Sequence, residues 1–170
     1  MELETVIKNR RSIRHYNEKE IEKRDIEKIL ECGILAPSAK NRQPWHFIVI
    51  KEDKDLKNEI GNLLEAWLPE ASLTSEVIKT SDTIIMIYAD IENTILDVQS
   101  VGACIENMVL KATDLDISSL WIGYTLKIEE ELKELLNTDK TLIATLALGY
   151  SEAKPKPRPR KALDNVSEWR

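Results

Sequence analysis

The chain has 170 residues, a formal net charge of −6, 42% hydrophobic residues and 32% charged residues. This length fits one domain with a core of its own, and the acidic balance argues against broad binding to nucleic acid or to anionic membranes. Any site that binds an anion must therefore be confined to a cluster of basic residues.

The periodicity of apolar residues predicts helices that alternate with strands. Helical spacing predicts helices over residues 2–9, 18–35, 53–67, 93–113 and 128–136. Apolar and β-branched runs predict strands over residues 45–50, 83–88, 119–122 and 142–148. Residues 70–80 are interpreted as a weaker helix or a loop. This alternation favours a single domain over residues 1–170, with an α+β or α/β sheet covered by helices.

Cysteine, histidine and terminal residues narrow the class of protein further. Cys32 and Cys104 lie in apolar helical stretches and are interpreted as core residues, with a disulfide as the less favoured alternative. Neither His15 nor His46 has Cys or His neighbours at ligand spacing, so the sequence predicts no metal site. The acidic start and the short apolar runs argue against a signal peptide and a membrane span, so we expect a cytoplasmic protein.

A cationic cluster opens the chain at residues 10–14. In an extended segment Arg10, Ser12 and Arg14 point to the same side, where two guanidiniums and a hydroxyl form a fork for a phosphate dianion. The alternative is a basic helix end whose solvated arginines complement the helix dipole.

A polar loop bracketed by prolines spans residues 36–45. Pro37 and Pro44 fix the backbone at both ends of this loop. Its other polar residues offer donors and acceptors to a ligand, namely Ser38, Asn41 and Gln43. The alternative is an ordinary connection built of turn-favouring residues.

Two more features accompany these clusters. Proline at alternate positions predicts an extended arm over residues 154–170, in which Arg158 and Arg160 share one side and can add charge to the same phosphate. The alternative is a solvated basic tail. Gly123 ends a predicted strand and either allows close approach of a ligand or marks a turn. Five scattered glycines cannot build a dinucleotide fingerprint or a P-loop, and no catalytic triad or Cys–His pair stands out.

Taken in order, these motifs resemble the FMN-dependent nitroreductase family over nearly the whole chain. The resemblance is carried by residues 10–14, 36–47, 121–123, 148–150 and 157–161. It implies the α+β nitroreductase fold, a central and mostly antiparallel sheet wrapped by helices. It also implies a homodimer with two FMN sites at its interface, in which a C-terminal arm (residues 154–170) extends from a core (residues 1–153) and embraces the partner.

The resemblance also implies a reaction and a set of site residues. NAD(P)H would pass hydride through flavin N5 to an oxidised small-molecule acceptor such as a nitroaromatic or a quinone, in a ping-pong cycle without a catalytic side chain. The phosphate, ribityl and pyrimidine end would be bound by Arg10, Arg11, Ser12 and Arg14, and the phosphate also by Arg158 and Arg160. The isoalloxazine would be lined by Pro37, Ser38 and Asn41 of the other subunit, and bordered near N5 by Ile122 and Gly123. Gln43 is assigned to the cofactor with them.

The chain departs from the family pattern at three places. Ala39 stands where the family often has a second hydroxyl residue, and residues 116–119 replace a Gly-rich turn, although Asp116 can adopt a left-handed turn conformation. Residues 67–80 carry no family signature, so no substrate is implied. The alternatives are a dehalogenase-like flavoenzyme on the same fold, a flavin-binding storage or sensor module without turnover, and a polyanion-binding protein, which the net charge disfavours.

Overall fold

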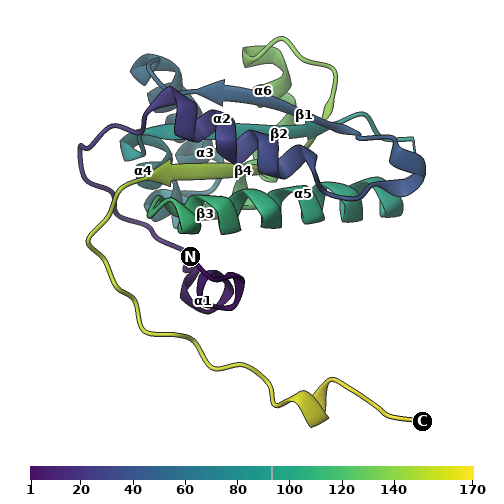
Figure 1. Ribbon diagram of the computed structural model, residues 1–170. Coiled ribbons are helices and arrows are strands. Elements are labelled where there is room, and N and C mark those ends of the chain that lie inside the picture. Colours follow the sequence, from purple (N-terminus) through teal and green to yellow (C-terminus); the bar gives the residue numbers. More distant parts are fainter. Residues whose placement is uncertain (93) are drawn as a thin grey trace.

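The computed structural model describes residues 1–92 and 94–170 and contains a four-stranded sheet between two layers of helices (Figure 1). All neighbouring strands are antiparallel, in the order β1-β2-β4-β3. The strands are β1 (Trp45–Ile50), β2 (Thr83–Ala89), β3 (Ser118–Ile122) and β4 (Thr141–Gly149). The predicted antiparallel sheet and the four predicted strands are confirmed.

The described residues form six helices. They are α1 (Leu3–Asn9), α2 (Lys23–Ile34), α3 (Lys54–Trp67), α4 (Ser72–Thr80), α5 (Thr94–Asp114) and α6 (Glu129–Leu135). Five of them pack on the sheet, and α1 packs on α5. The segment predicted as a weak helix or loop is therefore largely the helix α4. The first residue of the helix predicted over 93–113 lies outside the described residues.

One predicted helix boundary was wrong, because α2 begins at Lys23 and not at residue 18. The preceding residues bond elsewhere: the backbone N–H of Asn17 donates to the carbonyl of Tyr150 at 2.8 Å, and Asn17 Oδ1 accepts from the N–H of Lys19 at 3.1 Å. Ile21 still joins the core, from an extended segment. Ile21 therefore fits the helical spacing of apolar residues because it is buried, although it is not part of the helix.

Two hydrophobic cores lie on opposite faces of the sheet. On one face α2 and α5 pack on residues such as Ile85 and Leu146, and on the other α3, α4 and α6 pack on residues such as Met86 and Leu120. Strand β2 is buried along its whole length because both of its faces are covered. This explains why its sequence is a continuous apolar run.

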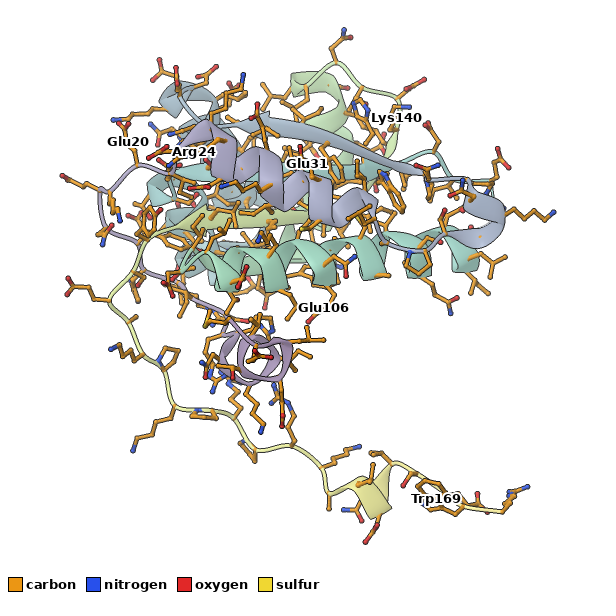
Figure 2. The ribbon with its side chains drawn as sticks, viewed as in Figure 1. Glu20, Arg24, Glu31, Glu106, Lys140 and Trp169 are labelled. Carbon is orange, nitrogen blue, oxygen red and sulfur yellow. The ribbon has the colours of Figure 1, made fainter. Side chains whose placement is uncertain are left out.

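The ends of the chain lie outside these layers. Helix α1 packs beside the C-terminal half of α5, where the amino group of Met1 contacts Asp114 at 2.5 Å. The C-terminal tail (residues 151–170) leaves β4 in an extended path with only a short 3₁₀ turn at Leu163–Asn165. Its residue Trp169 is 88% exposed and lies away from the body of the protein (Figure 2). The tail therefore carries apolar side chains that its own chain does not cover.

Two predictions about individual residues can be compared with the structure. Cys104 is buried, Cys32 is half-buried, and both are free thiols. Asp116 has a φ of 56°, the left-handed turn conformation expected of it. Within residues 1–92 and 94–170, no helix is both long and apolar enough to cross a bilayer, and no group of His, Cys, Asp and Glu is arranged to hold a metal ion.

Candidate functional site

The structure brings the opening arginines and the tail arginines together in one groove of about 560 Å³. This groove, called the arginine groove below, is lined by Arg10, Arg11, Ser12, Arg14, Arg158 and Arg160, together with Ile7, Lys8, Pro155, Lys156 and Pro157. Two segments separated by more than a hundred residues thus form one cationic surface. Six of the predicted site residues lie here.

The end of α1 and the edge of β3 set the shape of residues 10–14. Nη1 of Arg11 donates to the carbonyls of Lys8 and Arg10 at 2.6 and 2.9 Å, which satisfies acceptors at the C-terminal end of α1. The chain then runs beside β3, where the N–H of Ile13 donates to the carbonyl of Ser119 at 2.9 Å. Because Ile13 is buried, its neighbours Ser12 and Arg14 face solvent.

The arginine groove concentrates charge that is not neutralised within the chain. Among the described residues, Arg10, Arg14, Arg158 and Arg160 have no carboxylate within ion-pair distance, whereas nearby Lys8 pairs with Glu4 at 2.6 Å. Closely placed like charges repel one another and favour binding of an anion. The groove therefore has the unneutralised positive charge that binding of an anion requires, in an otherwise acidic protein.

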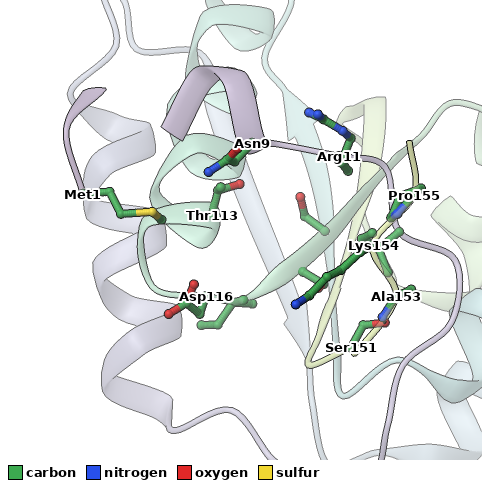
Figure 3. A pocket seen from close by; sticks show the side chains of 13 residues that line it. Met1, Asn9, Arg11, Thr113, Asp116, Ser151, Ala153, Lys154 and Pro155 are labelled. Carbon is green, nitrogen blue, oxygen red and sulfur yellow. The ribbon is translucent and has the colours of Figure 1, made fainter. Parts of the chain in front are cut away.

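A second hollow of about 480 Å³ adjoins the arginine groove, and Arg11 and Pro155 border both (Figure 3). Its lining includes Asn9, Thr113, Asp116, Ser151 and Lys154. Arg11 is half-buried, and its Nε is buried without a hydrogen-bond partner among the described residues. Arg11 thus differs from the exposed Arg14, because its guanidinium is tied to the backbone between the two hollows.

The predicted polar loop (residues 36–45), called the proline loop below, lies on the N-terminal half of α5. Ser38 Oγ accepts from the N–H of Gln43 at 3.0 Å and closes the loop on itself. Asn41 and Gln43 are exposed and have φ values of 55° and 50°. Pro37 is exposed, and Ser38 is half-buried. The four predicted site residues of this loop are therefore grouped together on the surface.

Two residues that the sequence patterns did not single out, Arg42 and Asp97, attach the proline loop to the body. Nη2 of Arg42 forms a short ion pair with Asp97, which is 0% exposed in the first turn of α5. A single acid among the apolar residues of that turn was the available signal, because such an acid in a packed helix needs a partner.

Within one chain the arginine groove and the proline loop lie far apart. The loop contacts α5 at Asp97 and Ser100, whereas α1, which leads into the groove, packs beside residues 107–114 of that helix (Figure 1). From Ser100 to Asp114 the helix rises about 21 Å. One copy of the chain therefore does not bring the two predicted parts of the site together.

The third predicted part is at the end of β3. Ile122 is buried in the core, so only its backbone can meet a ligand, whereas Gly123 is exposed. Gly123 has a φ of −101°, which any residue adopts, and a Cβ built there would meet nothing within 4 Å. Ser119, which lines the second hollow, and Gly123 are about 13 Å apart along the strand direction. Neighbouring Trp121 and Tyr124 are exposed aromatic side chains.

Comparisons with known proteins agree with this architecture. The model of the nitroreductase family matches residues 7–150. An Archaeoglobus fulgidus protein named "Putative NADH dehydrogenase/NAD(P)H nitroreductase" is 36% identical over 153 residues, covering 85% of this chain and 83% of that protein. A crystal structure from Desulfovibrio desulfuricans, described as a "putative nitroreductase in complex with fmn", is 27% identical with a TM-score of 0.85, covering 100% of this chain and 98% of that one. A Thermotoga neapolitana iodotyrosine deiodinase is 24% identical over 170 residues, covering 89% of each chain.

Proposed function

The chain belongs to the nitroreductase family, and on that premise we propose that it is an FMN-dependent oxidoreductase that works as a homodimer. Electrons would pass from NAD(P)H through FMN to a small oxidised acceptor such as a quinone or a nitroaromatic compound. The observation that carries this proposal is the arginine groove, in which four guanidiniums without carboxylate partners among the described residues converge from both ends of the chain.

The arginine groove fits the phosphate of FMN. A phosphate monoester carries close to two negative charges near neutral pH, and burying it requires compensating cations. Arg10 and Arg14 would approach it from one side and Arg158 and Arg160 from the other, with the hydroxyl of Ser12 as a further donor. The tied guanidinium of Arg11 would mainly hold this segment in place.

The ring of the flavin would lie along β3 toward Gly123. The open space beside Gly123 lets a flat ring approach the backbone of residues 122 and 123, and this supports the predicted position of N5 there. Pro37, Ser38, Asn41 and Gln43 would reach the same ring from the partner subunit. This arrangement supplies a reason for the wide separation of the loop and the groove within one chain.

A second copy of the chain would also cover apolar side chains that one copy leaves exposed. Ile95 and Val98 on α5 and Leu3 on α1 are 69%, 42% and 67% exposed, which suits an interface between subunits. The tail, whose Trp169 lies uncovered, would embrace the partner with residues 154–170. The unit of function would therefore be the dimer, with residues 1–153 of each subunit as its core.

When bound, FMN would supply the redox chemistry by accepting hydride at N5 and passing electrons on, which no side chain of this protein can do. The residues of the chain bind the phosphate, orient the ring and leave one ring face open to donor and acceptor in turn. No side chain is assigned as a general acid or base.

An absorption spectrum and an anaerobic titration test this function. The purified protein should carry or take up FMN, NADH or NADPH should bleach its visible bands without oxygen, and a quinone should restore them. Protein that stays colourless in excess FMN would refute the flavin site. If flavin binds but neither nucleotide bleaches it, the result would favour a storage or sensor module without turnover.

Because one relative is an iodotyrosine deiodinase, a dehalogenase-like activity is the alternative function to test. The two differ in what the reduced protein does to its acceptor. Release of iodide from an iodotyrosine by dithionite-reduced protein, without turnover of quinones or nitroaromatics, would favour the dehalogenase. The opposite pattern is expected from the proposed function.

A further inference from the structure

We infer that the buried ion pair of Arg42 and Asp97 holds the proline loop in the backbone conformation that contacts the flavin ring. Both are positioning residues, because they act through the loop and do not touch the ligand. The inference rests on the proposed function, since the loop is expected to meet the flavin of the partner subunit.

The proline loop adopts a backbone that its sequence disfavours. Lys40, Asn41 and Gln43 have φ values of 54°, 55° and 50°, and none of them is glycine. A left-handed conformation at Lys40 or at Gln43 lowers the population of that backbone by about fivefold or more. Asn lowers this cost somewhat, but Lys and Gln have no such advantage.

The hydrogen bonds inside the loop do not attach it to the rest of the protein. Asn41 N–H donates to the carbonyl of Ser38 at 2.9 Å, Arg42 N–H to that of Ala39 at 3.1 Å, and Gln43 N–H to Ser38 Oγ at 3.0 Å. All of these bonds join residues 38–43 to each other. These bonds define the shape of the turn. Contacts with the rest of the protein must hold the turn in place and offset the cost of its strained backbone.

Asp97 provides this anchor from the first turn of α5. One carboxylate oxygen accepts from Nη2 of Arg42, and the other accepts from the N–H of Glu92 at 3.0 Å. Asp97 is fully buried, and the Arg42 side chain is 20% exposed, so the pair is shielded from solvent screening. At the end of the loop the carbonyl of Pro44 accepts from the N–H of Asp90 at 3.0 Å, but this bond lies outside the strained residues 40–43. Nearer to them, the N–H of Ala39 lies 3.4 Å from Ser100 Oγ, and Arg42 Nε lies 3.8 Å from the exposed carboxylate of Glu92. The buried pair with Asp97 is therefore stronger than either of these two contacts.

The pair points away from the surface that the loop offers to a ligand. Lys40, Asn41 and Gln43 are exposed, whereas Arg42 between them turns inward to α5. Weakening the pair would therefore leave the ligand-facing groups intact and change only how often they are correctly placed. Apparent affinity falls in proportion to the fraction of molecules in the binding-competent state.

The test uses the Arg42→Gln variant of the full chain. Arg24→Gln is the matched control, because Arg24 on α2 forms an exposed pair with Glu22, the residue before that helix. FMN binding to the apoprotein, measured by quenching of flavin fluorescence, should weaken about 10-fold to about 100-fold in Arg42→Gln. Amide hydrogen exchange of residues 41–43 should accelerate in the same variant without flavin. The control should change neither quantity.

A second substitution separates positioning from general damage to the fold. Lys40→Gly relieves one strained position and should restore FMN affinity about fivefold in the Arg42→Gln background, but give no gain in the wild type, where the loop is already in place. Should Arg42→Gln fail to fold, Arg42→Lys takes its place in the same measurements, because it keeps the charge opposite Asp97.

Two outcomes overturn the inference and leave the proposed function standing. One is wild-type affinity for FMN in Arg42→Gln, and the other is a weakened affinity that Lys40→Gly does not restore. If the wild type does not bind FMN at all, the proposed function fails instead. Hydrogen exchange of the loop then still shows whether the pair holds its conformation.

Discussion

Replacement of Arg14 by alanine should weaken FMN binding by about 10-fold to about 150-fold. A charge-assisted hydrogen bond contributes about 1.5–3 kcal/mol, and this range converts to those ratios of dissociation constants. Arg14 is exposed, and its single intramolecular hydrogen bond, to the carbonyl of Ser12, is 3.4 Å long. The substitution should therefore cost less than about 0.5 kcal/mol of folding stability. Its effect on the ligand is separable from any effect on the fold.

Riboflavin makes this measurement specific, because it has the same ring system and ribityl chain as FMN but no phosphate. The apoprotein is titrated with both compounds at low and high ionic strength, with Arg24→Ala as the control for loss of an exposed arginine. Arg14→Ala should reduce the affinity for FMN, leave that for riboflavin unchanged, and lessen the salt dependence of FMN binding. Equal losses for both compounds, or no loss, would show that the phosphate does not lie in the arginine groove.

Four further predictions follow from other parts of the structure. Deletion of residues 154–170 should weaken both FMN binding and self-association, measured by flavin titration and sedimentation velocity; a flavin-loaded truncated dimer would contradict the embracing arm. Gly123→Ala adds a methyl group in open space, so unfolding free energy should change by less than about 0.5 kcal/mol while FMN affinity falls; unchanged affinity would place the ring elsewhere. Hydrogen bonds from Lys111 and the N-terminal amine lower the pKa of Asp114 to about 2 from 3.8, so its stabilisation is present above pH 3.8 and lost as the pH falls through about 2. The difference in unfolding free energy between wild type and Asp114→Asn, from urea titrations, should shrink across that window. Burial raises the pKa of Cys104 to about 12, so a thiol reagent at about pH 8 should modify it only after unfolding, as mass spectrometry can show.

Periodicity predicted most of the fold because the sheet is covered on both faces. The run from Ile84 to Ala89 is apolar throughout since each of its side chains is buried, and the long apolar stretch of α5 was recognised for the same reason. The error at the start of α2 arose where Ile21 is buried without being helical. Apolar spacing reports burial, and it predicts a helix only where the backbone has no other hydrogen-bond partners.

For the candidate site, some features can be recognised in the sequence and others only in the structure. The charge of residues 10–14 and of the tail is visible in the sequence, but the shared groove depends on β3 and on the path of the chain after β4. The loop of residues 36–45 was recognised from its prolines. The role of Arg42 was not, because its partner Asp97 lies 55 residues further along the chain. Contacts of this kind follow from how a loop packs on a helix, and local spacing does not contain them.

Three features of the single chain are unfavourable for that chain alone, and this is the strongest link between its structure and its proposed function. Guanidiniums that have no carboxylate partner among the described residues repel one another in the arginine groove, the proline loop holds left-handed residues, and α5 exposes apolar side chains near the loop. Residues that served only the stability of a monomer would avoid all three. Under the proposed function, association of two copies around FMN would relieve them in one event, since the phosphate would neutralise the groove, the ring would contact the loop and the partner would cover α5. Because the ligand and the partner would then complete the same site, cofactor binding and dimerisation should stabilise each other.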